Sequence, residues 1–268
     1  MKIRATEFLI GILVVVCFGL VFSAVYPFTT SSPHAATPPS ERFTVSDADA
    51  YSTTGHIAVD GDLRLAFEGA VTAEGEWYQK VVEPNVSSEK YQPSPNGSVY
   101  QRLTITGRDR AERIHEQITE EEDRILLREV RDGDRVTFVV EHTTNTAREP
   151  VSGTASVFVN SLYVANYGRA GSNSSGVTVY EPRSGWYEER STYRITEASG
   201  GVYANADTHV VRSANVSWEV TDPAGTYPEF MLSRLFSDDP TTYRITFEFN
   251  PNDTPLERPA WVGQTDSG

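Results

Sequence analysis

The sequence contains very little cysteine and very little lysine. Its one cysteine, Cys17, lies in an apolar N-terminal stretch, so the rest of the chain can form no internal disulfide. Lysine is restricted to Lys2, Lys80 and Lys90, against twenty arginines. Stability must therefore come from an ordinary hydrophobic core, and the roughly 220 residues beyond the N-terminal region are enough to form one.

Motifs for familiar chemistry are also missing. The sequence has no HExxH zinc motif, no Walker loop, no GxGxxG and no GxSxG. The Asp-Gly-Asp triplets at 60–62 and 132–134 lack the other ligands of a calcium loop and indicate hairpin turns. We therefore expect no enzyme activity, no cofactor and no metal site. The histidines are scattered, without the spacing of metal ligands: His34, His56, His115, His142 and His209.

Acidic side chains outnumber basic ones, 37 to 23, which gives a net charge of −14. An acidic, lysine-poor composition is typical of extreme halophiles, because molar salt shortens the Debye length to about 3 Å and screens self-repulsion. The alternative is an acidic protein from a mesophile with a GC-rich genome. No basic patch is visible, which argues against nucleic acid and against anionic lipid headgroups as partners.

The nineteen residues Phe8–Tyr26 carry no Asp, Glu, Lys or Arg. As a helix they would extend roughly 28 Å, close to the thickness of a bilayer core. Lys2 and Arg4 precede them, so the positive-inside rule predicts a cytoplasmic segment 1–7, a transmembrane signal anchor 8–26 and an extracellular remainder in a cell membrane. The alternative is a cleaved signal peptide, whose apolar core is usually about 7–15 residues long. Both alternatives export the domain.

Segment 27–42 is rich in Pro, Ser and Thr, which predicts an extended stalk. Beyond it we expect an extracellular domain at 43–250 and a polar tail at 251–268. Asn-x-Ser/Thr sequons occur more often than chance would give, and all lie on the predicted outer side, which predicts an N-glycosylated surface. The candidate acceptors are Asn85, Asn96, Asn173, Asn215 and Asn252.

Period-two alternation predicts about nine to eleven antiparallel strands within the domain. The clearest hairpins join Gly55–Val59 to Leu63–Phe67 through Asp60-Gly61, and Ile125–Val130 to Arg135–His142. Two proline-, glycine- or serine-rich stretches, Pro84–Ser98 and Gly171–Gly176, are predicted to be loops.

Helical spacing of apolar residues predicts short helices at Arg108–Glu122 and Tyr227–Phe236. Thr154–Tyr167 fits a helix and, because of its β-branched content, a strand nearly as well; a helix is favoured. The expected fold is α+β: a large, curved, mostly antiparallel sheet with two or three short helices packed on one face.

Aromatic residues are abundant, with four Trp, thirteen Tyr and twelve Phe. Most of those in the predicted elements should belong to the core. An unspecified minority of them could line a concave pocket for an apolar or sugar ligand. The residues in or beside predicted strands and helices include Trp77, Tyr78, Tyr100, Tyr163, Tyr167, Tyr180, Trp186, Tyr187, Tyr193, Tyr203, Trp218 and Tyr243.

The run Val59–Val81, VDGDLRLAFEGAVTAEGEWYQKV, resembles the glycine-punctuated early strands of LolA/LppX-type lipoprotein carriers. The resemblance implies a strongly curved antiparallel sheet that wraps over helices and shelters a lipid. The chain departs from the family because no lipobox precedes Cys17, and no site residues carry over. In composition the chain also resembles membrane-anchored cell-surface proteins of haloarchaea.

These observations support a non-enzymatic, membrane-anchored extracellular domain of a halophilic archaeon, which binds a lipid or other apolar ligand in a cavity of the curved sheet. One alternative is a cell-envelope interaction or structural glycoprotein without a small ligand. Another is a surface glycan hydrolase, because carboxylates far apart in a sequence can meet in space.

Overall fold

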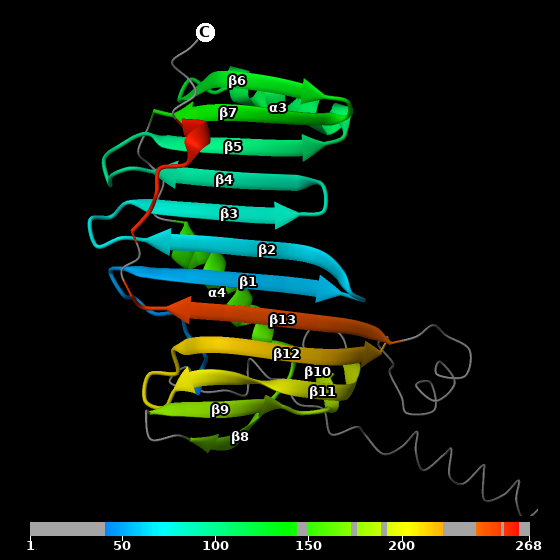
Figure 1. The fold of residues 1–268 in the computed structure, drawn as a ribbon. Coiled ribbons are helices and arrows are strands. Elements are labelled where there is room, and N and C mark those ends of the chain that lie inside the picture. The colour runs from blue at the N-terminus through cyan, green and yellow to red at the C-terminus, as the bar shows by residue number, and fades with distance from the viewer. Residues whose placement is uncertain are drawn as a thin grey trace, which may run out of the picture.

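The structure is a computed structural model that describes residues 41–143, 150–172, 176–188, 192–221, 240–252 and 255–262. These residues form one large sheet in which every pair of neighbouring strands is antiparallel (Figure 1). The order across the sheet is β6-β7-β5-β4-β3-β2-β1-β13-β12-β11-β9-β8, and β10 pairs with β11 outside this path. The strands are β1 Tyr51–Val59, β2 Asp62–Val71, β3 Trp77–Glu83, β4 Val86–Gln92, β5 Val99–Thr106, β6 Arg124–Asp132, β7 Arg135–His142, β8 Tyr167–Ser172, β9 Val177–Pro182, β10 Gly185–Glu188, β11 Thr192–Asn205, β12 Val211–Thr221 and β13 Thr241–Asn250.

The hairpin between β1 and β2 follows directly from its sequence. Val59 pairs with Asp62, so Asp60 and Gly61 form a two-residue turn. Both have positive φ, 53° and 86°, as a type I′ turn requires. This geometry favours Gly and Asp over most residues, and it fixes the register that places Phe67 on one side of the sheet and Glu68 on the other.

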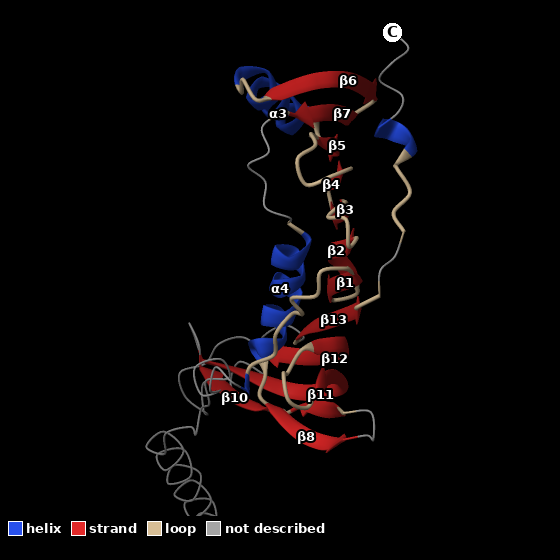
Figure 2. Ribbon diagram, turned by 90° about the vertical axis from the view of Figure 1, so that its left-hand side faces the viewer, coloured by secondary structure: helices blue, strands red, loops and turns tan. Residues whose placement is uncertain are grey.

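Two α-helices lie on the same side of the curved sheet, with α4 along its middle and α3 at the β6 end (Figure 2). Helix α3 spans Arg108–Glu120 and α4 spans Val151–Ser161, which continues into the 3₁₀ turn η2, Leu162–Val164. We call the helix-bearing side, which includes Phe67 and Phe247, the covered face. The other side, which includes Glu68 and Lys80, is the open face.

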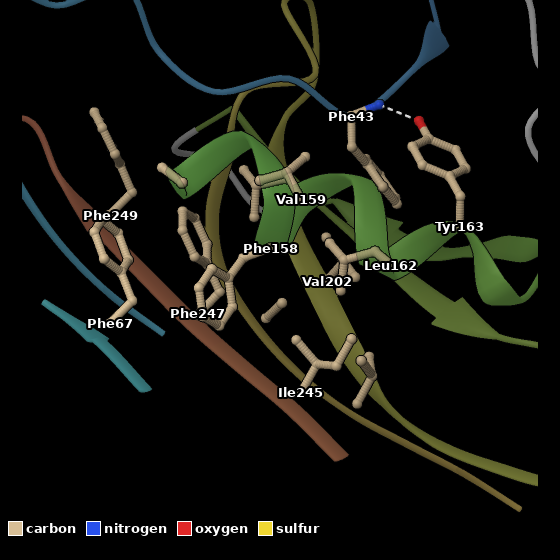
Figure 3. Close-up of a cluster of buried hydrophobic side chains, with 14 of the residues drawn as sticks. Phe43, Phe67, Phe158, Val159, Leu162, Tyr163, Val202, Ile245, Phe247 and Phe249 are labelled. Carbon is tan, nitrogen blue, oxygen red and sulfur yellow. Dashed lines mark hydrogen bonds between the residues drawn. The ribbon is translucent and has the colours of Figure 1, made fainter. Parts of the chain in front are cut away.

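The main core lies between α4 and the central strands, with Phe158 at its middle (Figure 3). Phe158 is completely buried and stacks on Phe67 and Phe247, with ring centroids 5.7 and 6.4 Å away. Helix and sheet approach closely because β1 has no side chain at Gly55, where a Cβ would lie 2.7 Å from the Phe158 ring. The space beneath this part of α4 is therefore filled by side chains.

A second, smaller core forms where α3 packs its buried Ala111 and Ile118 against β5 and β7. Between the two cores the covered face is polar: Gln101 donates to Ser88 Oγ at 3.0 Å, and its Oε1 lies 2.9 Å from His142 Nε2. Burial, together with the charges of Arg124 and Lys90, lowers the pKa of His142. The two helices thus cover separate parts of the sheet.

The predicted polar tail includes a segment that packs on the open face. The 3₁₀ turn η3, Ala260–Val262, buries Trp261 and Val262 against a cluster that includes Tyr91 and Val139. Trp261 Nε1 donates to Glu89 Oε2 at 3.2 Å. The contacts of 260–262 were not foreseen, because three residues are too few to produce a periodic pattern.

The predicted large, curved antiparallel sheet is confirmed. Two or three short helices were expected in an α+β fold; the described residues contain two α-helices and are mostly β. The loop expected at Pro84–Ser98 is partly wrong, because β4, Val86–Gln92, occupies about half of it. Its covered-face residues, Ser88 and Lys90, lie at the polar region between the helices, so the strand shows no apolar alternation. The loop expected at Gly171–Gly176 is also partly wrong, since β8 extends to Ser172.

Several other predictions fall on residues whose structure is not described. The helix predicted at Tyr227–Phe236 and the anchor at 8–26 both lie outside the described residues. Within the described ranges, no helix is long and apolar enough to cross a bilayer. The helix predicted at Arg108–Glu122 is confirmed as α3, and the ambiguous stretch Thr154–Tyr167 is helical over most of its length.

Candidate ligand-binding site

A pocket of about 650 Å³ opens at the β8–β9 end of the sheet, just beyond the end of α4. Beyond Ser161 the α-helix gives way to η2, and the chain then turns back into the sheet as β8. The sheet therefore continues past the helix that covers its centre, and a partly open hollow is left there. Its lining residues are Glu41, Phe43, Tyr163, Ala165, Asn166, Tyr167, Arg169, Tyr180, Arg183, Ala206 and His209.

Phe43 lies at the centre of the aromatic part of the pocket. Its ring contacts those of Tyr163, Tyr167 and Tyr180, with centroids 5.6, 5.2 and 5.3 Å away. Its backbone N–H donates to the hydroxyl oxygen of Tyr163 (Figure 3). Edge-to-face ring packing of this kind supplies a wide apolar surface with a fixed shape.

The residue after Phe43 ties the entering chain to the sheet. Thr44 N donates to His209 O, and Val211 N donates to Thr44 O, both at 3.0 Å. The end of the predicted stalk is thus held beside the pocket by backbone hydrogen bonds. Any ligand in the pocket would bind at the base of that stalk.

Tyrosine hydroxyls hold the backbone around the pocket in place. Tyr167 donates to Leu162 O at 2.8 Å, and Tyr193 donates to Val164 O at 2.7 Å. Burial raises the pKa of the Tyr167 phenol well above its usual value, with further contributions from Tyr163 and Tyr187. These phenols stay protonated at neutral pH, so they act as hydrogen-bond donors and packing surfaces rather than as bases.

Two guanidinium groups line the polar side of the pocket. Arg183 lies over Gly168, where an added Cβ would come 2.5 Å from its Nη2 atom. Arg169 Nη2 lies 3.5 Å from Thr178 Oγ1. Of the carboxylates that the structure describes, none lies within 4.0 Å of either guanidinium group.

His209 lines the pocket from the turn between β11 and β12. Its φ is 57°, a left-handed conformation that is uncommon for histidine, held by a bond from its N–H to Asn205 O at 3.0 Å. The ring lies 6.3 Å from that of Tyr180. Its Nδ1 atom is buried and has no hydrogen-bond partner among the described residues. A buried polar atom without a partner costs free energy.

The sequons lie away from this pocket. Asn85 and Asn96 are exposed in the β3–β4 and β4–β5 connections, and Asn252 is exposed just after β13. Asn215 is exposed in the middle of β12 on the open face. Asn173 lies outside the described residues. Glycosylation at these positions stays a prediction, and their exposure is consistent with it.

Sequence reasoning identified part of the pocket lining. Tyr163, Tyr167 and Tyr180 were among the aromatic candidates for a concave pocket, and all three line it. Arg169, Arg183 and His209 were missed as a group. They come from separate segments and share no spacing, so no local signal could have joined them; the described His, Cys, Asp and Glu residues also form no metal-binding group.

No protein-family model, no curated protein and no solved structure matches the chain.

Proposed function

We propose that the chain is a membrane-tethered extracellular domain that binds an apolar or amphiphilic ligand without transforming it. The observation that carries the proposal is the position of the aromatic pocket. Glu41, near the end of the predicted stalk, and Phe43, the first residue after it, are part of the pocket lining. A tethered domain with its binding site at the base of the tether would hold a ligand near the membrane.

The pocket at the β8–β9 end is a better location for the ligand than the space beneath α4. That space is filled by Phe67, Phe158 and Phe247, and a ligand would have to displace this packing. The pocket is partly open and has aromatic walls. A curved sheet with helices on one side is also the arrangement that the resemblance to LolA/LppX-type carriers implies, which supports a carrier-like role.

Native mass spectrometry on the full chain, extracted from membranes in high salt, tests the proposal. We expect a mass above that of the polypeptide and its glycans, released on denaturation. Ala206→Trp places a large ring at the pocket wall and should abolish the extra mass. The matched control is Ala73→Trp, in the exposed β2–β3 turn, which should retain it. A wild-type protein that carries no ligand, or an Ala206→Trp variant that keeps it, would contradict the proposal.

A further inference from the structure

The pocket has a charge opposite to that of the molecule as a whole. The chain has a net charge of −14, yet Arg169, Arg183 and His209 line this one cavity. Glu41 is the one carboxylate among the lining residues that the structure describes, and its side chain is exposed. Arg169 and Arg183 are exposed as well, so water and salt screen all three charges alike, and the two guanidinium groups outnumber the one carboxylate.

The two arginines are available to a ligand. Carboxylates are abundant in the chain, yet none of those described lies within 4.0 Å of either guanidinium group. By contrast, Arg102 on the open face is bound by Glu89. A guanidinium group has five N–H donors in a planar fork that matches phosphate geometry, so two such groups in one pocket form an anion-binding arrangement.

His209 adds a third recognition element. Its Nδ1 is buried without a partner among the residues described, and its backbone is held in a left-handed conformation by two hydrogen bonds. A non-glycine residue in this conformation persists where surrounding contacts over-determine it, and such positions are enriched at ligand sites. The imidazole faces the same cavity as the arginines and would donate a hydrogen bond to an anion there.

We infer that the pocket recognises a phosphate-class anion through Arg169, Arg183 and His209, with an attached apolar group against Phe43, Tyr167 and Tyr180. This inference rests on the proposed function and names the ligand's chemistry. It reverses the expectation from composition that anionic headgroups are excluded, because that expectation considered net charge and not the local grouping of cations. A phospholipid headgroup and a free phosphate share this chemistry.

Equilibrium dialysis with the full chain in an uncharged, phosphate-free alkyl glycoside detergent tests the inference, with protein-free detergent as background. The probes are hexyl phosphate, hexanol and inorganic phosphate, at constant high salt. Hexyl phosphate should bind at least tenfold more tightly than hexanol, because charge-assisted hydrogen bonds form to phosphate alone. Tighter binding of hexyl phosphate than of inorganic phosphate indicates a lipid-like ligand, and equal binding indicates a free anion; both support anion recognition.

Arg183→Gln and Arg169→Gln should each weaken binding of hexyl phosphate about tenfold, while binding of hexanol stays unchanged. Arg169 is the variant less able to disturb packing, since its one described polar contact is the long one to Thr178. Arg64→Gln, at an exposed position in β2, removes the same charge and should have no effect.

Three results would overturn the inference, and none of them by itself overturns the proposed function. Equal affinity for hexanol and hexyl phosphate would leave an apolar site without anion recognition, so the proposed function would stand. If no probe binds, or if Arg64→Gln weakens binding as much as Arg183→Gln, the anion site is wrong, and native mass spectrometry decides separately whether any ligand is carried.

Discussion

The covered and open faces are built from the same strands and differ in the burial and polarity of their side chains. In β2, Phe67 is buried beneath α4, whereas the next residue, Glu68, is exposed on the open face. In β13, Phe247 packs on Phe158, whereas Thr246 lies across from His56 on the other side. Strand alternation thus assigns the two faces, and the helices complete one of them.

The covered face is itself divided into a filled centre and an open end. At the centre, Gly55 lets Phe158 reach the sheet, and no space remains. At the β8–β9 end, α4 has already stopped, so Phe43 and the tyrosines pack on one another around a hollow. The packing that stabilises the fold and the proposed ligand pocket are therefore adjacent parts of one face.

The largest effect should appear when the core between α4 and the covered face is truncated. Phe158→Ala should lower the free energy of unfolding by about 3–5 kcal/mol, because a fully buried phenyl ring leaves a cavity. Val157→Ala, one residue earlier on α4 and 51% exposed, should change it by less than about 0.5 kcal/mol. Chemical denaturation followed by tryptophan fluorescence measures both. Equal effects would mean that α4 does not pack as described.

A smaller, pH-dependent effect should come from the open face. Burial and the hydrogen bond to Glu76, together with its charge, raise the pKa of Tyr91 to about 12. The unfolded chain loses this proton near pH 10, so the stabilisation is complete below that pH and is lost as the pH rises toward 12. Between pH 10 and 12 we expect the free energy of unfolding of the wild type to fall by about 1 kcal/mol more than that of Tyr91→Phe. Identical declines in wild type and variant between pH 10 and 12 would contradict this.

The smallest effect on stability should come from Asn215. It is exposed at mid-strand on the open face, across from Gly201. Asn215→Gln should leave the free energy of unfolding within about 0.5 kcal/mol and remove one glycan mass in a glycosylating archaeal host. Glycopeptide mass spectrometry checks this, with Asn85→Gln as the matched turn variant. If Asn85 is modified and Asn215 is not, the predicted glycan at Asn215 is wrong.

Local chemistry explains which parts of the fold could be predicted. Asp60-Gly61 specified its hairpin because few residue pairs tolerate two positive φ angles. Ala111, Ile114 and Ile118 specified α3 because their spacing matches a helical face. Strand β4 could not be predicted in this way, because Ser88 and Lys90 face the polar region between the helices and Glu89 is bonded to Trp261, far along the chain.

Of the candidate site, the aromatic part was foreseeable and the charged part was not. Tyr163, Tyr167 and Tyr180 belong to an aromatic-rich sequence in which some rings were expected to line a pocket. The positions of Arg169, Arg183 and His209 depend on the pairing of β8 with β9 and on the turn before β12.

The sequence by itself determined an acidic, disulfide-free chain with a hydrophobic N-terminal stretch and a mostly antiparallel sheet, because composition and short-range alternation are local properties. The tertiary structure alone decided where α4 stops covering that sheet. It also decided that two arginines and a histidine from three segments line one pocket in a chain of net charge −14. Cavities and local charge depend on which distant residues become neighbours, and net charge and periodicity contain no information about that.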